Sequence, residues 1–271
     1  MRLVTSIARW VRESPFDNLY RSSRLYRNYR ARELKRWTAS DAQMAGFYAQ
    51  FINDGDLCFD IGANLGCRTK VFLGLGAKVV AVEPQDACMR VLRRAYTGVP
   101  RVSLVQAGVG AQEGEEEMLI SSQWHEVSSF SREWINAVRQ SGRQQHVRWE
   151  RYQRVPMTTL DALIARHGRP AFIKIDVEGY EERVLRGLSR PVDALSFEYS
   201  PETPEAAFAC IDRLDAIGQA TFNVAVAEHL QLDRRDWMGA DEMKRHLDGL
   251  IHALDKPGDV YARFSRTASA S

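Results

Sequence analysis

From residue 55 onward, short apolar runs alternate with segments of helical pattern. The apolar runs occupy residues 57–61, 78–83, 102–107, 172–177, 194–199, 222–227 and 259–264. The helical patterns occupy residues 86–96, 159–167, 181–188 and 204–217. Strands that alternate with helices predict an α/β fold with a mostly parallel sheet, in which right-handed crossovers place helices on both faces.

One stretch interrupts this alternation. Residues 115–121 and 149–157 have the pattern of two strands, and the polar segment 122–148 lies between them. We therefore expect an inserted β-hairpin with a lid over residues 115–157, on the substrate side of the domain. The alternative is a surface insertion that contacts no ligand.

Composition is that of a folded protein with a sizeable core. The chain has 271 residues, of which 45% are hydrophobic and 27% charged. These values exclude disordered and collagen-like chains, and no apolar run approaches the roughly 18 residues that a membrane span needs. We expect one domain over residues 41–271, preceded by an arm over residues 1–40.

The arm is basic. Residues 1–36 hold ten Lys or Arg against three acidic residues, whereas the rest of the chain holds 27 basic and 32 acidic residues. Basic residues interleaved with aromatic ones could touch an anionic membrane surface, nucleic acid or an acidic partner. The alternative is a helical arm that packs on its own domain or on a sister subunit in a homo-oligomer. Because the body is acidic, we do not expect nucleic acid as a partner.

Cysteine usage favours a reducing, cytoplasmic setting, with membrane association through the arm left open. Four cysteines without a Cys-x-x-Cys pair match neither a zinc site nor a disulfide scaffold, and we assign no metal ligand, although an even number leaves a disulfide formally open. The first residues also lack the apolar stretch of a signal peptide.

The first chemical motif follows the run 57–61 and reads Asp60-Ile61-Gly62-Ala63-Asn64-Leu65-Gly66. Gly62 permits a tight turn after the strand, and Gly66 permits close approach of a ligand where the next helix begins. Glu83 ends the next strand, 23 residues after Asp60. An acid at that place can accept hydrogen bonds from both hydroxyls of a ribose.

The glycine spacing discriminates between ligands. Asn64 stands where a dinucleotide fingerprint has the glycine that makes room for pyrophosphate, and no P-loop pattern is present. A ligand with ribose but without pyrophosphate, such as S-adenosylmethionine, therefore fits best. An ordinary strand–turn–helix with glycines is the alternative.

The second motif spans residues 172–179 and reads FIKIDVEG. Side chains alternate along a strand, so Lys174, Asp176 and Glu178 share one face. Asp176 and Glu178 would emerge at the carboxyl end of the strand, where ligands bind in such sheets. The alternative is a structural ion pair between Lys174 and Asp176. Glu198, near the end of the next run, is either an acceptor-binding residue or an exposed acid.

These segments resemble the FkbM-type S-adenosylmethionine-dependent methyltransferases. The matching motifs are DIGANLG at 60–66, VAVEP at 80–84, TLD at 159–161, IKIDVEGYE at 173–181, SFEY at 196–199 and GDVYAR at 258–263. The resemblance covers residues 40–265 and does not extend to the basic arm. It implies a Rossmann-like domain with a seven-stranded sheet and donor binding by the glycine loop and Glu83.

The resemblance also implies O-methylation of a hydroxyl on a sugar or a secondary metabolite. Its donor-binding positions are Asp60, Gly62, Asn64, Gly66 and Glu83 in this sequence. One departure is the segment Gly108-Val109-Gly110-Ala111, which lacks the carboxylate that the family commonly places near the adenine.

An alcohol is a weak nucleophile, so a positioned base assists its methylation. Asp176 and Glu178 are the candidates by location, and His125 is a third because its ordinary pKa lies near neutrality. The acceptor would be a small-molecule or glycan hydroxyl.

Two other functions remain open. Asp176-Val177-Glu178 could serve as an Asp-x-Asp-like metal motif in a metal-dependent sugar-nucleotide transferase. The fold could also be a non-catalytic nucleoside-binding module, because fold alone does not establish activity. The glycine spacing disfavours a nicotinamide oxidoreductase.

Overall fold

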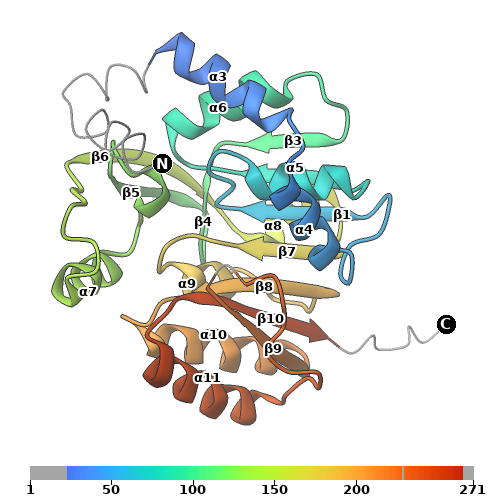
Figure 1. Cartoon of the computed structure of the whole chain (residues 1–271), viewed down its shortest axis with the longest axis vertical. Helices are drawn as coiled ribbons and strands as arrows, with labels where there is room; N and C mark the ends of the chain where they lie inside the picture. The colour runs from blue at the N-terminus through green and yellow to red at the C-terminus, as the bar shows by residue number, and fades with distance from the viewer. Residues whose placement is uncertain (1–22, 228, 265–271) are drawn as a thin grey trace.

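A computed structural model describes residues 23–227 and 229–264 (Figure 1). Most of the basic arm, residues 1–22, therefore lies outside the described residues. The described part begins with α3 (Arg24–Leu34), which is capped by Ser23. The helix α4 (Ala39–Tyr48) follows, with a capping box between Thr38 and Asp41. The expected end of the arm at residue 40 thus falls inside a helix.

A seven-stranded sheet forms the centre of the molecule. Its strands are β1 (Leu57–Ile61), β2 (Lys78–Val82), β3 (Val102–Val105), β7 (Phe172–Ile175), β8 (Ala194–Tyr199), β9 (Ala220–Val226) and β10 (Gly258–Phe264). The spatial order is β3-β2-β1-β7-β8-β10-β9, and β10 runs antiparallel to both of its neighbours. The pairs from β3 to β8 are parallel, which confirms the expected mostly parallel α/β sheet.

Helices cover both faces of this sheet (Figure 1). With α3 and α4, the helices α5 (Cys67–Gly74) and α6 (Asp86–Tyr96) enclose one apolar core. The helices α8 (Leu160–His167), α9 (Glu181–Arg186), α10 (Pro204–Ile217) and α11 (Ala240–Leu254) enclose the other. The short apolar strands read as continuous hydrophobic runs because both of their faces are buried.

The inserted region forms a second, three-stranded sheet in the order β4-β6-β5. Its strands are β4 (Gly108–Val109), β5 (Gly114–Ile120) and β6 (Arg151–Thr158), and β5 pairs antiparallel with β6. The chain leaves the main sheet after β3. A side chain at Gly108 would overlap Met157 and Phe130, so glycine permits this transfer between the sheets.

Between β5 and β6 the chain is folded rather than a structureless polar loop. It contains the short 3-10 helix η1 (His125–Val127) and α7 (Arg132–Ser141), which is capped by Ser131. Trp134, Ile135 and Val138 of α7 are buried against Trp149 in a small apolar core of their own. The helical spacing of these apolar residues was obscured in the sequence by the polar residues between them.

The described part of the arm packs on the domain. Ala31 and Leu34 of α3 are buried, and Asn28 accepts a hydrogen bond from Arg94 of α6. Within the described residues, no helix is long and apolar enough to span a bilayer. All four cysteines are free thiols, so no disulfide forms among them.

Candidate functional site

A cavity of about 250 Å³ opens at the carboxyl ends of β1, β2 and β7. This is the edge of a parallel sheet where ligands of such folds bind. Of the eight residues predicted to bind the donor or to act in catalysis, six line it, namely Gly62, Asn64, Glu83, His125, Asp176 and Glu178. The remaining two, Asp60 and Gly66, do not line it.

Gly62 brings the ends of β1 and β7 together. Its φ is +81°, in the left-handed region that favours glycine. A Cβ at this position would overlap the carbonyl oxygen of Asp176. The glycine is therefore required for contact between two strand ends of the protein itself, in addition to the tight turn that the motif predicts.

Glu83 is 2% exposed and holds the loop after β1 in place. One carboxylate oxygen accepts a hydrogen bond from the backbone N–H of Asn64, and the other accepts from the N–H of Gln85, both at 2.7 Å. Each oxygen keeps one further acceptor position, so the carboxylate can still receive two hydroxyls from the cavity. Burial raises the pKa of Glu83 to about 7.

Asp60 and Gly66 contact other parts of the protein and support the loop after β1 from the side away from the cavity. The Asp60 carboxylate is buried and accepts a 2.5 Å hydrogen bond from the hydroxyl of Thr69 in α5. Gly66, with φ +84°, precedes α5, and a Cβ there would press on Leu92. Their direct contact with a donor, expected from the motif, stays a prediction.

Lys174 and Asp176 form part of a buried ion-pair network. The Lys174 side chain is 1% exposed, and its Nζ lies 3.2 Å from Asp176 Oδ2 and 2.8 Å from Asp259 Oδ1. Burial alone would raise the pKa of Asp176, but the charges of Lys174 and Arg68 and the hydrogen bonds with Lys174 and Glu198 together outweigh it, so the pKa is lowered. Asp176 therefore both belongs to a structural ion pair and lines the cavity.

Three carboxylates gather at this edge, from Asp176, Glu178 and Glu198. One oxygen of each lies within 4.8 Å of the others, a spacing at which they could hold a divalent cation. Burial, followed by the charge of Asp176, raises the pKa of Glu178 and of Glu198 well above the ordinary range. A proton is thus retained at this edge at pH values where exposed carboxyls are ionised.

The charge of the cavity restricts its ligand. Five carboxylate residues line it, which are Glu83, Glu126, Asp176, Glu178 and Glu198, and no Lys or Arg does so in the part of the chain that the structure describes. Such a lining offers a diphosphate no cation to pair with, and Asp176, which stays ionised beside Lys174, suits a ligand that carries positive charge. A nucleoside with a sulfonium and an ammonium group, as in S-adenosylmethionine, fits both this charge and the acceptor positions of Glu83.

Comparison with known proteins now decides the family. The Methyltransferase FkbM domain matches residues 60–235 of the sequence. The chain belongs to the FkbM methyltransferase domain family. It is therefore an S-adenosylmethionine-dependent methyltransferase with a Rossmann-like fold. No curated protein matches the sequence.

Solved structures with a similar fold are distant from this FkbM methyltransferase in sequence. One is a precorrin-6y C5,15-methyltransferase from Geobacter metallireducens GS-15, with 12% identity and a TM-score of 0.39 over 82% of this chain and 87% of that one. Another is the C-terminal domain of precorrin-6Y C5,15-methyltransferase from Rhodobacter capsulatus, with 12% identity and a TM-score of 0.38 over 83% and 89%.

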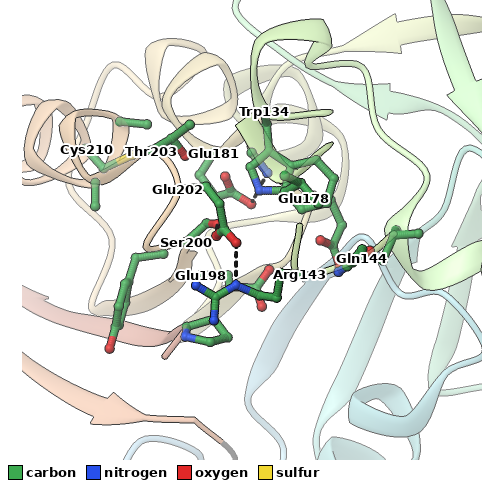
Figure 2. A pocket seen from close by; sticks show the side chains of 17 residues that line it. Trp134, Arg143, Gln144, Glu178, Glu181, Glu198, Ser200, Glu202, Thr203 and Cys210 are labelled. Carbon is green, nitrogen blue, oxygen red and sulfur yellow. Dashed lines mark hydrogen bonds and ion pairs between the residues drawn. The ribbon is translucent and has the colours of Figure 1, made fainter. Parts of the chain in front are cut away.

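A second cavity, of about 140 Å³, adjoins the first in this FkbM methyltransferase. Figure 2 shows the side chains that line it. Within the described ranges, only Glu178 and Glu198 line both cavities. Glu178 has a φ of +56°, which is unusual for a residue with a side chain. Its carbonyl accepts a 2.6 Å hydrogen bond from Ser129, so the inserted region holds this strained turn.

His125 lies on the side of the first cavity. Its backbone carbonyl accepts a hydrogen bond from Gln85, and its ring lies 3.1 Å from a Glu126 carboxylate oxygen. It lines the first cavity but not the second, in contrast to Glu178. Its catalytic role stays a prediction, and its position is less suited to contact an acceptor in the second cavity.

Sequence reasoning missed several lining residues. Gln85, Met118 and Phe130 border the first cavity beside Ala107 and Gly108. Gln85 comes two residues after Glu83 and could have been suspected from that position. Met118 and Phe130 reach the cavity only because the small sheet folds over it, and they give that side of the cavity an apolar surface.

Proposed function

We propose that this methyltransferase transfers a methyl group to a hydroxyl of a sugar, a glycan or a secondary metabolite. The observation that carries the proposal is that Glu178 and Glu198 form the shared wall of the two cavities. A carboxylate in that position can face a donor on one side and an acceptor hydroxyl on the other.

When bound, S-adenosylmethionine supplies a methyl group on a positively charged sulfur. Glu83 accepts hydrogen bonds from the donor ribose. Gly62 and Asn64 shape the loop after β1 that lies beside it, and the Asn64 N–H is bonded to Glu83. Asp176 stays ionised beside Lys174 and offers a negative charge to the positively charged end of the donor. Methyl transfer is an in-line displacement, and a rigid sheet edge aligns its partners.

The acceptor hydroxyl transfers its proton to the carboxylate of Glu178 or Glu198. Glu178 and Glu198 have raised pKa values, which makes either one a stronger base than an exposed carboxylate once it is ionised. A base of this kind accelerates reaction of a weak nucleophile by roughly 10²- to 10⁴-fold.

A sugar-nucleotide transferase is the second candidate, because the three carboxylates could hold a metal ion. The absence of Lys and Arg among the described residues of the donor cavity argues against a diphosphate ligand. A thermal-shift experiment discriminates the two. S-adenosylhomocysteine should raise the melting temperature by mass action, and UDP with Mn²⁺ should not. The opposite result would overturn the proposal.

The base assignment is tested with single variants and an isotopically labelled methyl donor. Glu178→Gln and Glu198→Gln should keep affinity for S-adenosylhomocysteine and lose labelled transfer to a hydroxyl-bearing extract. The same two measurements on Asp176→Asn and His125→Ala test whether either of these residues is the base instead. If all four variants bind and turn over normally, the assignment is wrong. If the product carries methyl on carbon or nitrogen, the O-methyl proposal fails.

A further inference from the structure

The second cavity has walls from five parts of the chain (Figure 2). The inserted region contributes α7 and the residues after it, the segment after β7 contributes Glu178, Gly179 and Glu181, and β8 contributes its end and the following loop. The first two turns of α10 and Pro257, just before β10, complete the lining. Because Glu178 and Glu198 separate it from the donor cavity, it is the space into which an acceptor would place its reacting hydroxyl. This step rests on the proposed function.

Arg143 is the one basic residue among the described residues that line this cavity, and it is already engaged. Its Nε contacts a Glu202 carboxylate oxygen at 2.5 Å, as Figure 2 shows. Its Nη1 donates to the backbone carbonyl of Asp255 and its Nη2 to Asp255 Oδ1. All three guanidinium nitrogens thus already have a carboxylate or carbonyl partner within the protein.

Carboxylates outnumber this cation. Glu178, Glu181, Glu198 and Glu202 all line the cavity. Glu202 is the partner of Arg143 and has a lowered pKa, whereas burial raises the pKa of Glu181 to about 7. Because Arg143 is already engaged by Glu202 and Asp255, an acceptor carboxylate or phosphate would be buried here without a counter-ion, which is unfavourable. An ammonium group could instead pair with Glu181 or Glu198 once that carboxyl is ionised.

The remaining lining supplies hydroxyls and a small apolar surface. Ser200 and Thr203 lie beside Glu202, and Ala206, Ala207 and Cys210 of α10 form the apolar side. Carboxylates and hydroxyls hydrogen-bond to several hydroxyls at once, and the alanines accommodate the C–H face of a compact ring. These features suit a sugar-like alcohol.

We infer that the second cavity is the acceptor site, and that it takes a sugar-like alcohol that is neutral or carries an ammonium group, to the exclusion of sugar acids and sugar phosphates. This narrows the acceptor class by charge, which the family assignment leaves open.

The test uses three probes that differ only at carbon 6, with the full chain saturated in S-adenosylhomocysteine. They are methyl α-glucoside, its 6-amino-6-deoxy derivative and its uronic acid. Saturation-transfer NMR should detect the first two, with the uronic acid at least about tenfold weaker. Glu198→Gln should narrow the difference between the amino sugar and the uronic acid, because it removes a carboxyl that can ionise and pair with the ammonium group. Equal or stronger binding of the uronic acid, or binding of none of the three, overturns the inference.

A pair of variants on α10 locates the binding. Ala206 lines the second cavity, whereas Ala209, on the same helix, does not. Ala206→Phe should abolish the sugar signal and keep the affinity for S-adenosylhomocysteine, and Ala209→Phe should keep both. Sugar binding that survives Ala206→Phe in a folded protein overturns the site. If the unaltered protein fails to bind S-adenosylhomocysteine, the proposed function itself fails. That result differs from the two above, in which S-adenosylhomocysteine binds and only the sugar results contradict the inference.

Discussion

The hydroxyl of Ser129 donates a 2.6 Å hydrogen bond to the backbone carbonyl of Glu178. Ser129 is fully buried in the inserted region, and Glu178 follows β7 in the main sheet. The same Ser129 oxygen accepts from the N–H of Ser131, the residue that caps α7. One side chain thus couples the fold of the insertion to the turn that presents the wall between the two cavities.

Removal of this bond should impair catalysis more than donor binding. Ser129→Ala leaves the Glu178 carbonyl without its partner, at an expected cost of about 1–3 kcal/mol in unfolding free energy. Turnover should fall because the strained turn at Glu178 loosens, while S-adenosylhomocysteine affinity changes little. Ser131→Ala is the control, since loss of its helix cap costs about 1 kcal/mol without contact to Glu178. Equal turnover in the two variants would contradict the coupling.

Substitution of Gly62 should destabilise the fold as well as the donor site. Gly62→Ala places a Cβ against the Asp176 carbonyl in addition to the strain of a positive φ. Gly98 has a similar φ of +83° with nothing within 4 Å of its Cβ position, so Gly98→Ala isolates the strain, about 1–2 kcal/mol. Urea unfolding should show a larger loss for Gly62→Ala. Equal losses of unfolding free energy in the two variants would mean that the ends of β1 and β7 move apart to accommodate the Cβ at no cost.

Donor affinity should depend on pH through Glu83. Its pKa is raised to about 7 in the folded chain, and ribose hydroxyls prefer the ionised carboxylate as acceptor. Affinity for S-adenosylhomocysteine should therefore rise as the pH increases through about 7, with release of a proton. Glu83→Gln should bind more weakly and lose this part of the pH dependence. Calorimetry in buffers of different ionisation enthalpy measures the proton directly, and no proton release would contradict the assignment.

The same carboxyl also affects stability. Because its folded pKa lies above its unfolded value of 4.5, the folded state binds more protons between these values, so this contribution to stability falls as pH rises from about 4.5 to about 7. Glu83→Gln should flatten this portion of the stability profile. An unchanged slope in urea unfolding across that window would show that other groups produce it.

Lys174 should be essential for stability. Lys174→Met leaves Asp176 and Asp259 without their buried cation, a change that costs about 3–5 kcal/mol when one partner of a buried pair is removed. The double variant Lys174→Met with Asp259→Asn should recover part of that loss. Denaturant unfolding measures both, and a loss below about 1 kcal/mol for the single variant would show that the pair behaves as an exposed one.

Arg143 should position the wall of the second cavity. Arg143→Gln releases the inserted region from Glu202 and Asp255, so acceptor KM should rise while S-adenosylhomocysteine affinity is retained. Arg132→Gln, at an exposed site of the same region with a single carboxylate 4.0 Å away, should leave both unchanged. A lower kcat with unchanged acceptor KM would instead place Arg143 outside acceptor positioning.

Local sequence pattern was sufficient for the main sheet and for the glycine turn that follows β1. The apolar runs correspond to β1, β2, β7 and β8 because parallel strands buried on both faces need continuous apolar residues. Gly62 and Glu83 were identifiable because a tight turn and an acid at a strand end have fixed spacings along the chain. The small core of the insertion escaped notice, since its tryptophans pack across β6 and α7 and not along one segment.

By itself, then, the sequence determined the order and type of the central elements, the donor loop and the acid that follows β2, because each depends on residues close together in the chain. Only the tertiary structure decided that Glu178 and Glu198 form one wall between two cavities, that Lys174 holds both Asp176 and Asp259, and that Arg143 joins the insertion to α11. These relationships connect residues far apart in the chain, and their geometry follows from strand order and packing, which no local pattern encodes.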